Sequence, residues 1–154
     1  MKARATILTL ALCFVGAAAC FAADAFTGTW KLNEAKSKFS PGSPKNITVV
    51  YEAVGDNVKV TIDGIDGDGK PVHSEWTGQF DGKDYPVTGD PNSDSRALKT
   101  IDDHTLTFTV KKGDKVTTSG RIVLSADGKT RTVTTSGTGP KGNKISGTAV
   151  YDKQ

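Results

Sequence analysis

The stretch Leu106-Thr107-Phe108-Thr109-Val110 decides the fold class, because large apolar side chains alternate strictly with threonines. A period of two places the apolar side chains on one face of a pleated strand and the polar ones on the other. The run from Val58 to Asp63 repeats the pattern, with apolar residues separated by lysine and threonine. Threonine, which favours strands over helices, is abundant in the rest of the chain. The sequence therefore predicts an all-β protein.

Dense turn signals divide the chain from residue 26 onward into about ten short strands. Glycine, and less readily asparagine or aspartate, tolerates the positive φ of tight hairpins, and such residues recur between the alternating runs. The expected strands are 26–33, 46–54, 58–63, 71–80, 84–88, 95–101, 104–111, 115–124, 130–138 and 144–151. Short hairpins without a long crossover predict a single up-and-down antiparallel β-barrel, since closure removes exposed strand edges.

Two segments interrupt this regular meander. Between Glu34 and Lys45 we expect one short helical turn after the first strand, capped by Asn33 and stopped by Pro41. Pro86 lacks a backbone N–H, so strand 84–88 is expected at an edge or gap of the sheet.

Residues 1–22 are expected to be a secretory signal peptide. Lys2 and Arg4 form a basic head, the run from Ala5 to Ala22 carries no charge, and small residues occupy its end. We expect cleavage after Ala22, with cleavage after Ala25 as the alternative. The mature domain, residues 23–154, would then be periplasmic or extracellular and would have no transmembrane segment.

The two cysteines, Cys13 and Cys20, both lie in this leader, so the mature domain would have neither disulfides nor thiol chemistry. The segment 17–20 loosely resembles a bacterial lipobox, which makes a lipid anchor at Cys20 a less favoured alternative. Loss of Lys2 and Arg4 lowers the 20 basic residues to 18 against 17 acidic ones, a net charge of +1. No basic stripe remains to indicate a nucleic-acid partner.

The two ends of the mature chain resemble the calycins, the lipocalins and fatty-acid-binding proteins. Gly28 and Trp30 form the G-x-W of their opening strand, and the segment 147–153 is similar to the closing strand of fatty-acid-binding proteins. The segments 30–33, 38–42 and 81–89 resemble a group of small, uncharacterised bacterial secreted proteins. The resemblance implies a monomeric lipocalin-like barrel that binds a small molecule.

The resemblance also assigns structural and ligand-binding roles to particular residues. In calycins the G-x-W tryptophan packs against an arginine of a late strand, so Arg121 or Arg131 would be the partner of Trp30, and Gly28 would be structural with them. Fatty-acid-binding proteins hold a carboxylate with Arg-x-Tyr in the closing strand. Here Ala149 stands at the arginine position and only Tyr151 matches, which favours a neutral head group.

No catalytic or metal-binding motif is present, so we expect neither an enzyme nor a cofactor. No serine lies in a G-x-S-x-G turn. His73 and His104 have no thiol or third ligand for zinc, and a calcium loop starting at Asp66 fails because Lys70 occupies its fifth position.

The expected ligand-binding residues lie on the inward faces of the strands, and they are Tyr51, Trp76, Phe80, Phe108 and Tyr151. Tyr51 shares its face with Val49 and Ile47. Threonines and serines in 115–120 and 130–138 would form a hydroxyl wall, and the resulting interior suits a small apolar or amphipathic molecule. Two alternatives stay open: a filled barrel without a usable cavity, and a non-enzymatic interaction module, such as an envelope or inhibitor-type barrel. The latter would bind a protein through loops Gly89–Asp94 and Gly139–Asn143.

Overall fold

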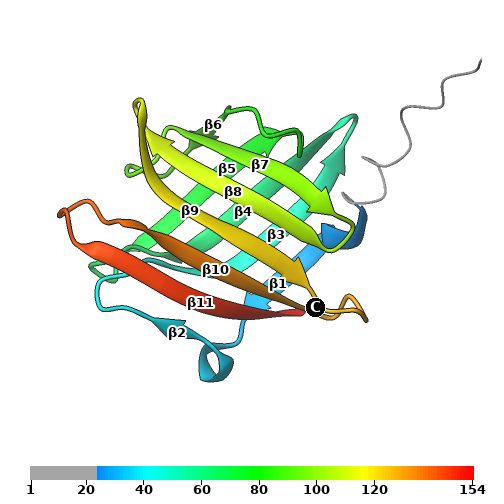
Figure 1. Ribbon diagram of the computed structural model, residues 1–154, viewed down its shortest axis with the longest axis horizontal. Coiled ribbons are helices and arrows are strands. Elements are labelled where there is room, and N and C mark those ends of the chain that lie inside the picture. The colour runs from blue at the N-terminus through cyan, green and yellow to red at the C-terminus, as the bar shows by residue number, and fades with distance from the viewer. Residues whose placement is uncertain (1–23) are drawn as a thin grey trace, which may run out of the picture.

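The computed structural model describes residues 24–154 and shows a closed antiparallel β-barrel (Figure 1). The expected signal peptide and the alternative anchor at Cys20 lie outside the described residues. Within 24–154 no helix is long and apolar enough to cross a membrane. The strands are β1 Gly28–Leu32, β2 Lys38–Phe39, β3 Lys45–Val54, β4 Asn57–Ile65, β5 Pro71–Gly78, β6 Tyr85–Thr88, β7 Ser95–Asp102, β8 Thr105–Lys112, β9 Lys115–Leu124, β10 Thr130–Thr138 and β11 Lys144–Lys153.

Strand β1 closes the barrel by pairing with β3 on one side and with β11 on the other. Trp30 lies opposite Val49 of β3 and Lys153 of β11. The remaining strands follow in sequence order from β3 to β11, so the predicted up-and-down barrel of ten strands is confirmed. One strand is added to it: β2 pairs with β11 beyond the end of β1, at Phe39 opposite Gly147.

The expected helical turn is present and shorter than predicted. It is a 3₁₀ turn over Glu34–Lys36, and the Asn33 side chain accepts a hydrogen bond from the Lys36 N–H at 3.2 Å. The first strand begins at Gly28 rather than at residue 26. Phe26 instead belongs to a helical turn at 24–26, and its side chain is fully buried.

Pro86 predicted an edge or gap position for strand β6, and the strand is not at an edge. It lies between β5 and β7, and it pairs with each through only a short stretch. The pairing is short because proline offers no N–H to a ladder.

The apolar core fills the end of the barrel where β1 begins. Phe80 packs edge-on against Phe26 and Tyr51 and stacks on Trp76, with ring centroids 6.2–6.5 Å apart. Tyr85 of β6 closes this cluster against Trp76. Aromatic rings therefore seal one end, and space remains toward the other.

Candidate functional site

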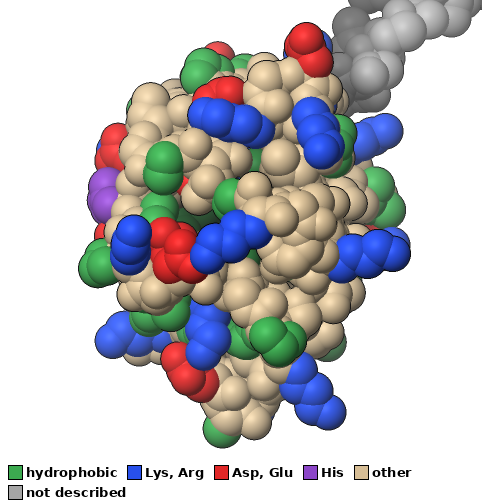
Figure 2. All heavy atoms as spheres, turned by 90° about the vertical axis from the view of Figure 1, so that its left-hand side faces the viewer, with side chains coloured by type: hydrophobic (Ala, Val, Ile, Leu, Met, Phe, Trp, Pro, Cys, Tyr) green, Lys and Arg blue, Asp and Glu red, His purple; other side chains and the backbone are tan. Residues whose placement is uncertain are grey.

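A cavity of about 550 Å³ occupies the barrel interior above the aromatic core. Its walls come from the inner faces of the strands, and its rim comes from the loops that hold Asp66, Asp90–Ser93 and Gly139–Gly142. Figure 2 shows a hollow on one face of the molecule, bordered by side chains of both charges. A volume of this size suits a small organic ligand.

The strand register aligns inward-facing residues of β1 and of β7 to β11 in four rows of cross-strand partners. The rows are Arg96, Val110 and Thr118; then Leu98, Phe108, Gly120 and Thr135; then Leu106, Ile122, Val133 and Ala149; and last Leu124, Arg131, Tyr151 and Leu32. All of them except Gly120, Leu106, Leu124 and Leu32 line the cavity, and the middle two rows are mainly apolar. The first and the last row contain one arginine each.

Arg131 lies at the floor of the cavity inside an aromatic cage. Its guanidinium carbon is 5.0 Å from the ring centroids of Trp30 and Tyr51 and 4.6 Å from that of Tyr151. The residue is 2% exposed, and neither Nε nor Nη1 has a hydrogen-bond partner among the described residues. Cation–π contacts contribute about 0.5–2 kcal/mol each and do not replace the hydrogen bonds that a buried guanidinium requires.

Tyr151 sits directly opposite Arg131 in the β10–β11 pair. Burial raises the pKa of Tyr151 to about 12, and the nearby Arg131 charge opposes this rise. Its hydroxyl donates a hydrogen bond to the carbonyl oxygen of Asn46 at 2.9 Å. That proton is therefore already engaged, so Tyr151 forms part of the wall and does not donate to a ligand.

Arg96 lines the same cavity beside the loop Asp90–Ser93 and is half-buried. Desolvation lowers its pKa, while the electrostatic influence of Tyr51 and Asp90 raises it. Arginines form no ion pair in the part of the chain that the structure describes. The cavity thus contains two guanidinium groups without a carboxylate partner.

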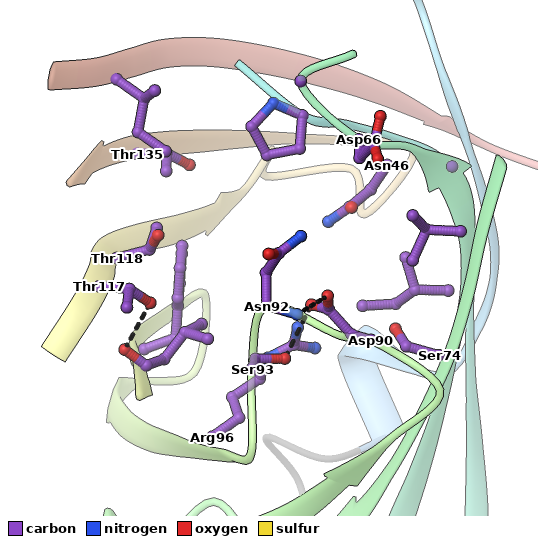
Figure 3. A pocket seen from close by; sticks show the side chains of 18 of the residues that line it. Asn46, Asp66, Ser74, Asp90, Asn92, Ser93, Arg96, Thr117, Thr118 and Thr135 are labelled. Atoms are coloured by element: carbon purple, nitrogen blue, oxygen red, sulfur yellow. Dashed lines mark hydrogen bonds between the residues drawn. The ribbon is translucent and has the colours of Figure 1, made fainter. Parts of the chain in front are cut away.

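A hydroxyl wall faces the loop that carries Asp90. Figure 3 shows Thr117, Thr118 and Thr135 on one side of the cavity, with Asn92 between them and Asp90. Thr117 donates its own proton to the Val110 carbonyl oxygen at 3.2 Å. The predicted hydroxyl-bearing faces of β9 and β10 therefore do line the interior.

Of the five residues predicted to contact a ligand, three line the cavity and two do not. Tyr51, Phe108 and Tyr151 line the cavity. Trp76 and Phe80 do not line it, because they stack on each other in the aromatic core. The indole Nε1 of Trp76 also donates to the backbone oxygen of Arg96 at 2.8 Å, which ties the core to the cavity wall.

The calycin resemblance offered two arginines as the partner of Trp30, and the structure distinguishes between them. Arg131 is the arginine that packs on Trp30, whereas Arg121 is exposed and is not the partner. Gly28 adopts a φ of 120°, and a Cβ there would lie 2.9 Å from Lys153 Cε. Lys153 covers the Trp30 ring as a second cation, with its Nζ 5.3 Å from the centroid.

Sequence reasoning missed Arg96 as a cavity residue. The sequence does contain the signal, because Arg96 shares the inward parity of Leu98 within the predicted strand 95–101.

No cluster of three metal-ligating side chains exists within residues 24–154. His73 instead pairs with Asp63 at 2.6 Å on the exposed surface.

The comparisons with known proteins identify no family. No family model matches the chain, and no curated protein does. Similar solved structures include the redesigned β-barrel mFAP1 bound to DFHBI, at 15% identity over 86% of this chain and 98% of that one, with a TM-score of 0.44. EF1p2_mFAP2b bound to DFHBI has 12% identity, coverage of 88% and 99%, and a TM-score of 0.49. A de novo designed fluorescence-activating β-barrel has 13% identity, coverage of 86% and 97%, and a TM-score of 0.43.

Proposed function

We propose that the protein is an exported carrier that holds one small amphipathic acid in its barrel cavity. The observation that carries the proposal is Arg131, a buried guanidinium on the cavity floor with two nitrogens unpaired among the described residues. A buried charge without a partner is costly, so a site that retains one is suited to a ligand of opposite charge.

The wall above Arg131 supports an amphipathic ligand rather than a small inorganic anion. Leu98, Phe108, Ile122 and Val133 offer an apolar surface to a hydrocarbon or aromatic body. An acidic head group replaces the neutral one that Ala149 favoured, because the cation comes from β10 instead of β11. The hydroxyl of Tyr51, which also lines the cavity, is a candidate donor to the same head group.

Export follows from the leader in the sequence, and the fold supports cleavage after Ala22 over cleavage after Ala25. Cleavage after Ala25 would place the new ammonium group on Phe26, which is fully buried. The Phe26 carbonyl oxygen also accepts the Trp30 Nε1 proton at 2.9 Å. Intact-mass measurement of protein from its native host should give a chain that begins at Ala23, whereas a lipid-modified Cys20 or an uncut chain would contradict this.

A protein-interaction module is the rival function, and the loop geometry disfavours it. Asp90–Ser93 and Gly139, Pro140 and Gly142 all line the cavity, so both candidate docking loops contribute residues to the ligand site that we propose. We expect no enzymatic activity, because the sequence carries no catalytic motif. A substrate-dependent turnover that one point substitution abolishes would overturn that expectation.

A matched pair of fluorescent probes tests the carrier. Anilinonaphthalene sulfonate and phenylnaphthylamine share one skeleton and differ in the acidic group. We expect the purified protein to bind the sulfonate about tenfold or more tightly, and Arg131→Met to remove that preference. Arg121→Met, on the exposed face, is the matched control and should keep it. Absence of saturable binding of either probe, with the native protein capturing a partner through its loops, would favour the interaction module.

A further inference from the structure

We propose that Arg96 forms a second anion-binding subsite in the same cavity, beside the loop Asp90–Ser93, so that the preferred ligand is an amphiphile with two acidic groups. The proposal rests on the carrier function and makes its ligand class narrower. It is carried by the juxtaposition of Arg96, the loop Asp90–Ser93 and Arg131 around one partly apolar cavity.

Arg96 is positioned by the sheet and has no internal partner. It lies in β7 between Tyr85 of β6 and Val110 of β8. Its carbonyl oxygen holds the Trp76 indole, which fixes the backbone. The guanidinium itself forms neither a hydrogen bond nor an ion pair with any residue in the described range 24–154.

The charge of Asp90 acts on Arg96, but the Asp90 carboxylate accepts its hydrogen bonds from groups of its own loop. Oδ1 accepts the Asn92 N–H at 2.8 Å and Oδ2 accepts the Ser93 hydroxyl at 2.7 Å. Both oxygens are therefore engaged within the loop. Asp90 compensates the Arg96 charge only partly, at more than ion-pair distance.

The loop cannot easily swing to complete that ion pair, because both of its ends are anchored. Asp94 accepts hydrogen bonds from Lys112 Nζ and the Gly113 N–H, each at 2.8 Å. At the base of the loop the Val87 N–H donates to the Asp94 carbonyl oxygen at 2.9 Å, which joins its two ends. The partial charge balance around Arg96 is therefore built into the fold.

The two arginines line one continuous cavity and share a neighbour there. The Tyr51 ring centroid lies 5.0 Å from the Arg131 guanidinium carbon, and Tyr51 is also within electrostatic reach of Arg96. Apolar side chains such as Phe108 line the cavity wall beside them. A ligand with one acid would leave one guanidinium unpaired, whereas a ligand with two would pair both.

Competition between decanedioate and decanoate for bound anilinonaphthalene sulfonate tests the second subsite. The two acids share one chain and differ in the second carboxylate. For the wild-type protein we expect decanedioate to displace the probe at about tenfold lower concentration. Arg96→Met should abolish this difference while leaving decanoate affinity within about twofold. Arg96→Lys should retain part of it, and Arg131→Met should weaken both acids.

Asp90→Asn provides an independent variant, because it removes the negative charge nearest to Arg96 without removing volume. It should strengthen decanedioate binding further, and Arg121→Met should behave as wild type. Equal affinity for the two acids, or a preference that survives Arg96→Met, would overturn the second subsite. Failure of both acids and of the probe to bind would contradict the carrier function itself.

Discussion

Two cations lie over the Trp30 ring at the closed end of the barrel, Arg131 at 5.0 Å and Lys153 at 5.3 Å from its centroid. Its ring is fully buried, and its Nε1 donates to the Phe26 carbonyl oxygen. Trp30→Ala should therefore lower the free energy of unfolding by about 3–5 kcal/mol, measured by urea denaturation. Lys31→Ala, exposed on the same strand, should change it by less than about 0.5 kcal/mol. Similar losses for the two variants would show that Trp30 has no special structural role.

Tyr151 links the floor of the cavity to the alkaline stability of the protein. Its pKa is about 12 in the folded state because of burial, against the usual 10. Below pH 10 both states keep the phenolic proton, and the stability is unaffected. Between pH 10 and 12 the unfolded chain loses this proton first, so stability falls by up to about 2–3 kcal/mol.

Tyr151→Phe isolates this contribution from the lysines that titrate in the same range. At neutral pH the variant should lose about 1 kcal/mol through the missing hydrogen bond to Asn46. Above pH 10 its stability should fall less steeply than that of the wild type in urea titrations. Parallel curves for the two proteins would mean that Tyr151 is not the group responsible.

At the scale of elements, β9 passes unusually close to its neighbours at Gly120. A Cβ there would collide with the Thr134 carbonyl oxygen and would lie 2.6 Å from Phe108 Cζ. Gly120→Ala should therefore destabilise by at least about 1–3 kcal/mol, and it should also alter probe binding because Phe108 must move within the cavity. Ser119→Ala, next to it on β9, is the control for thermal denaturation. Equal melting temperatures would show that β9 relaxes without cost.

The sequence predicted the barrel strands because alternation and glycine turns are local signals. It missed β2, since Lys38 and Phe39 are too few residues to show a period, and their pairing depends on Gly147 far along the chain. It also placed Ile47 inside with Tyr51. A bulge between Asn46 and Thr48 reverses that parity, and Ile47 is 40% exposed.

The sequence predicted which side chains point into the barrel, but not how far along the barrel each of them lies. Parity placed Tyr51 and Phe108 toward the interior, and both line the cavity. Parity places Trp76 inward as well, yet it cannot tell the closed end of a barrel from the open end. The sequence could not show that Arg131 lacks a carboxylate partner, because this depends on which acidic side chains the fold brings close to it.

Within residues 24–154, the shortest strand pairings around the barrel flank β6, and they adjoin the proposed second subsite. Strand β6 pairs with β5 only at Glu75–Thr88 and Trp76–Val87, and with β7 only at Tyr85–Arg96 and Pro86–Ser95. In contrast, β10 and β11 pair along almost their full lengths. Local opening requires the least free energy where backbone hydrogen bonds are fewest.

Hydrogen exchange followed by mass spectrometry should therefore show the fastest exchange, among the barrel strands, at 85–88. We expect these amides to exchange at least about tenfold faster than those of 131–136, because breaking few ladder hydrogen bonds frees them. Bound decanedioate should slow exchange at 85–88 more than bound decanoate does, because its second carboxylate would reach Arg96, the β7 partner of Tyr85. Arg96→Met should remove that extra protection and leave the fast exchange of the free protein unchanged. Equal protection of 85–88 and 131–136 in the free protein would contradict the low local stability expected for β6.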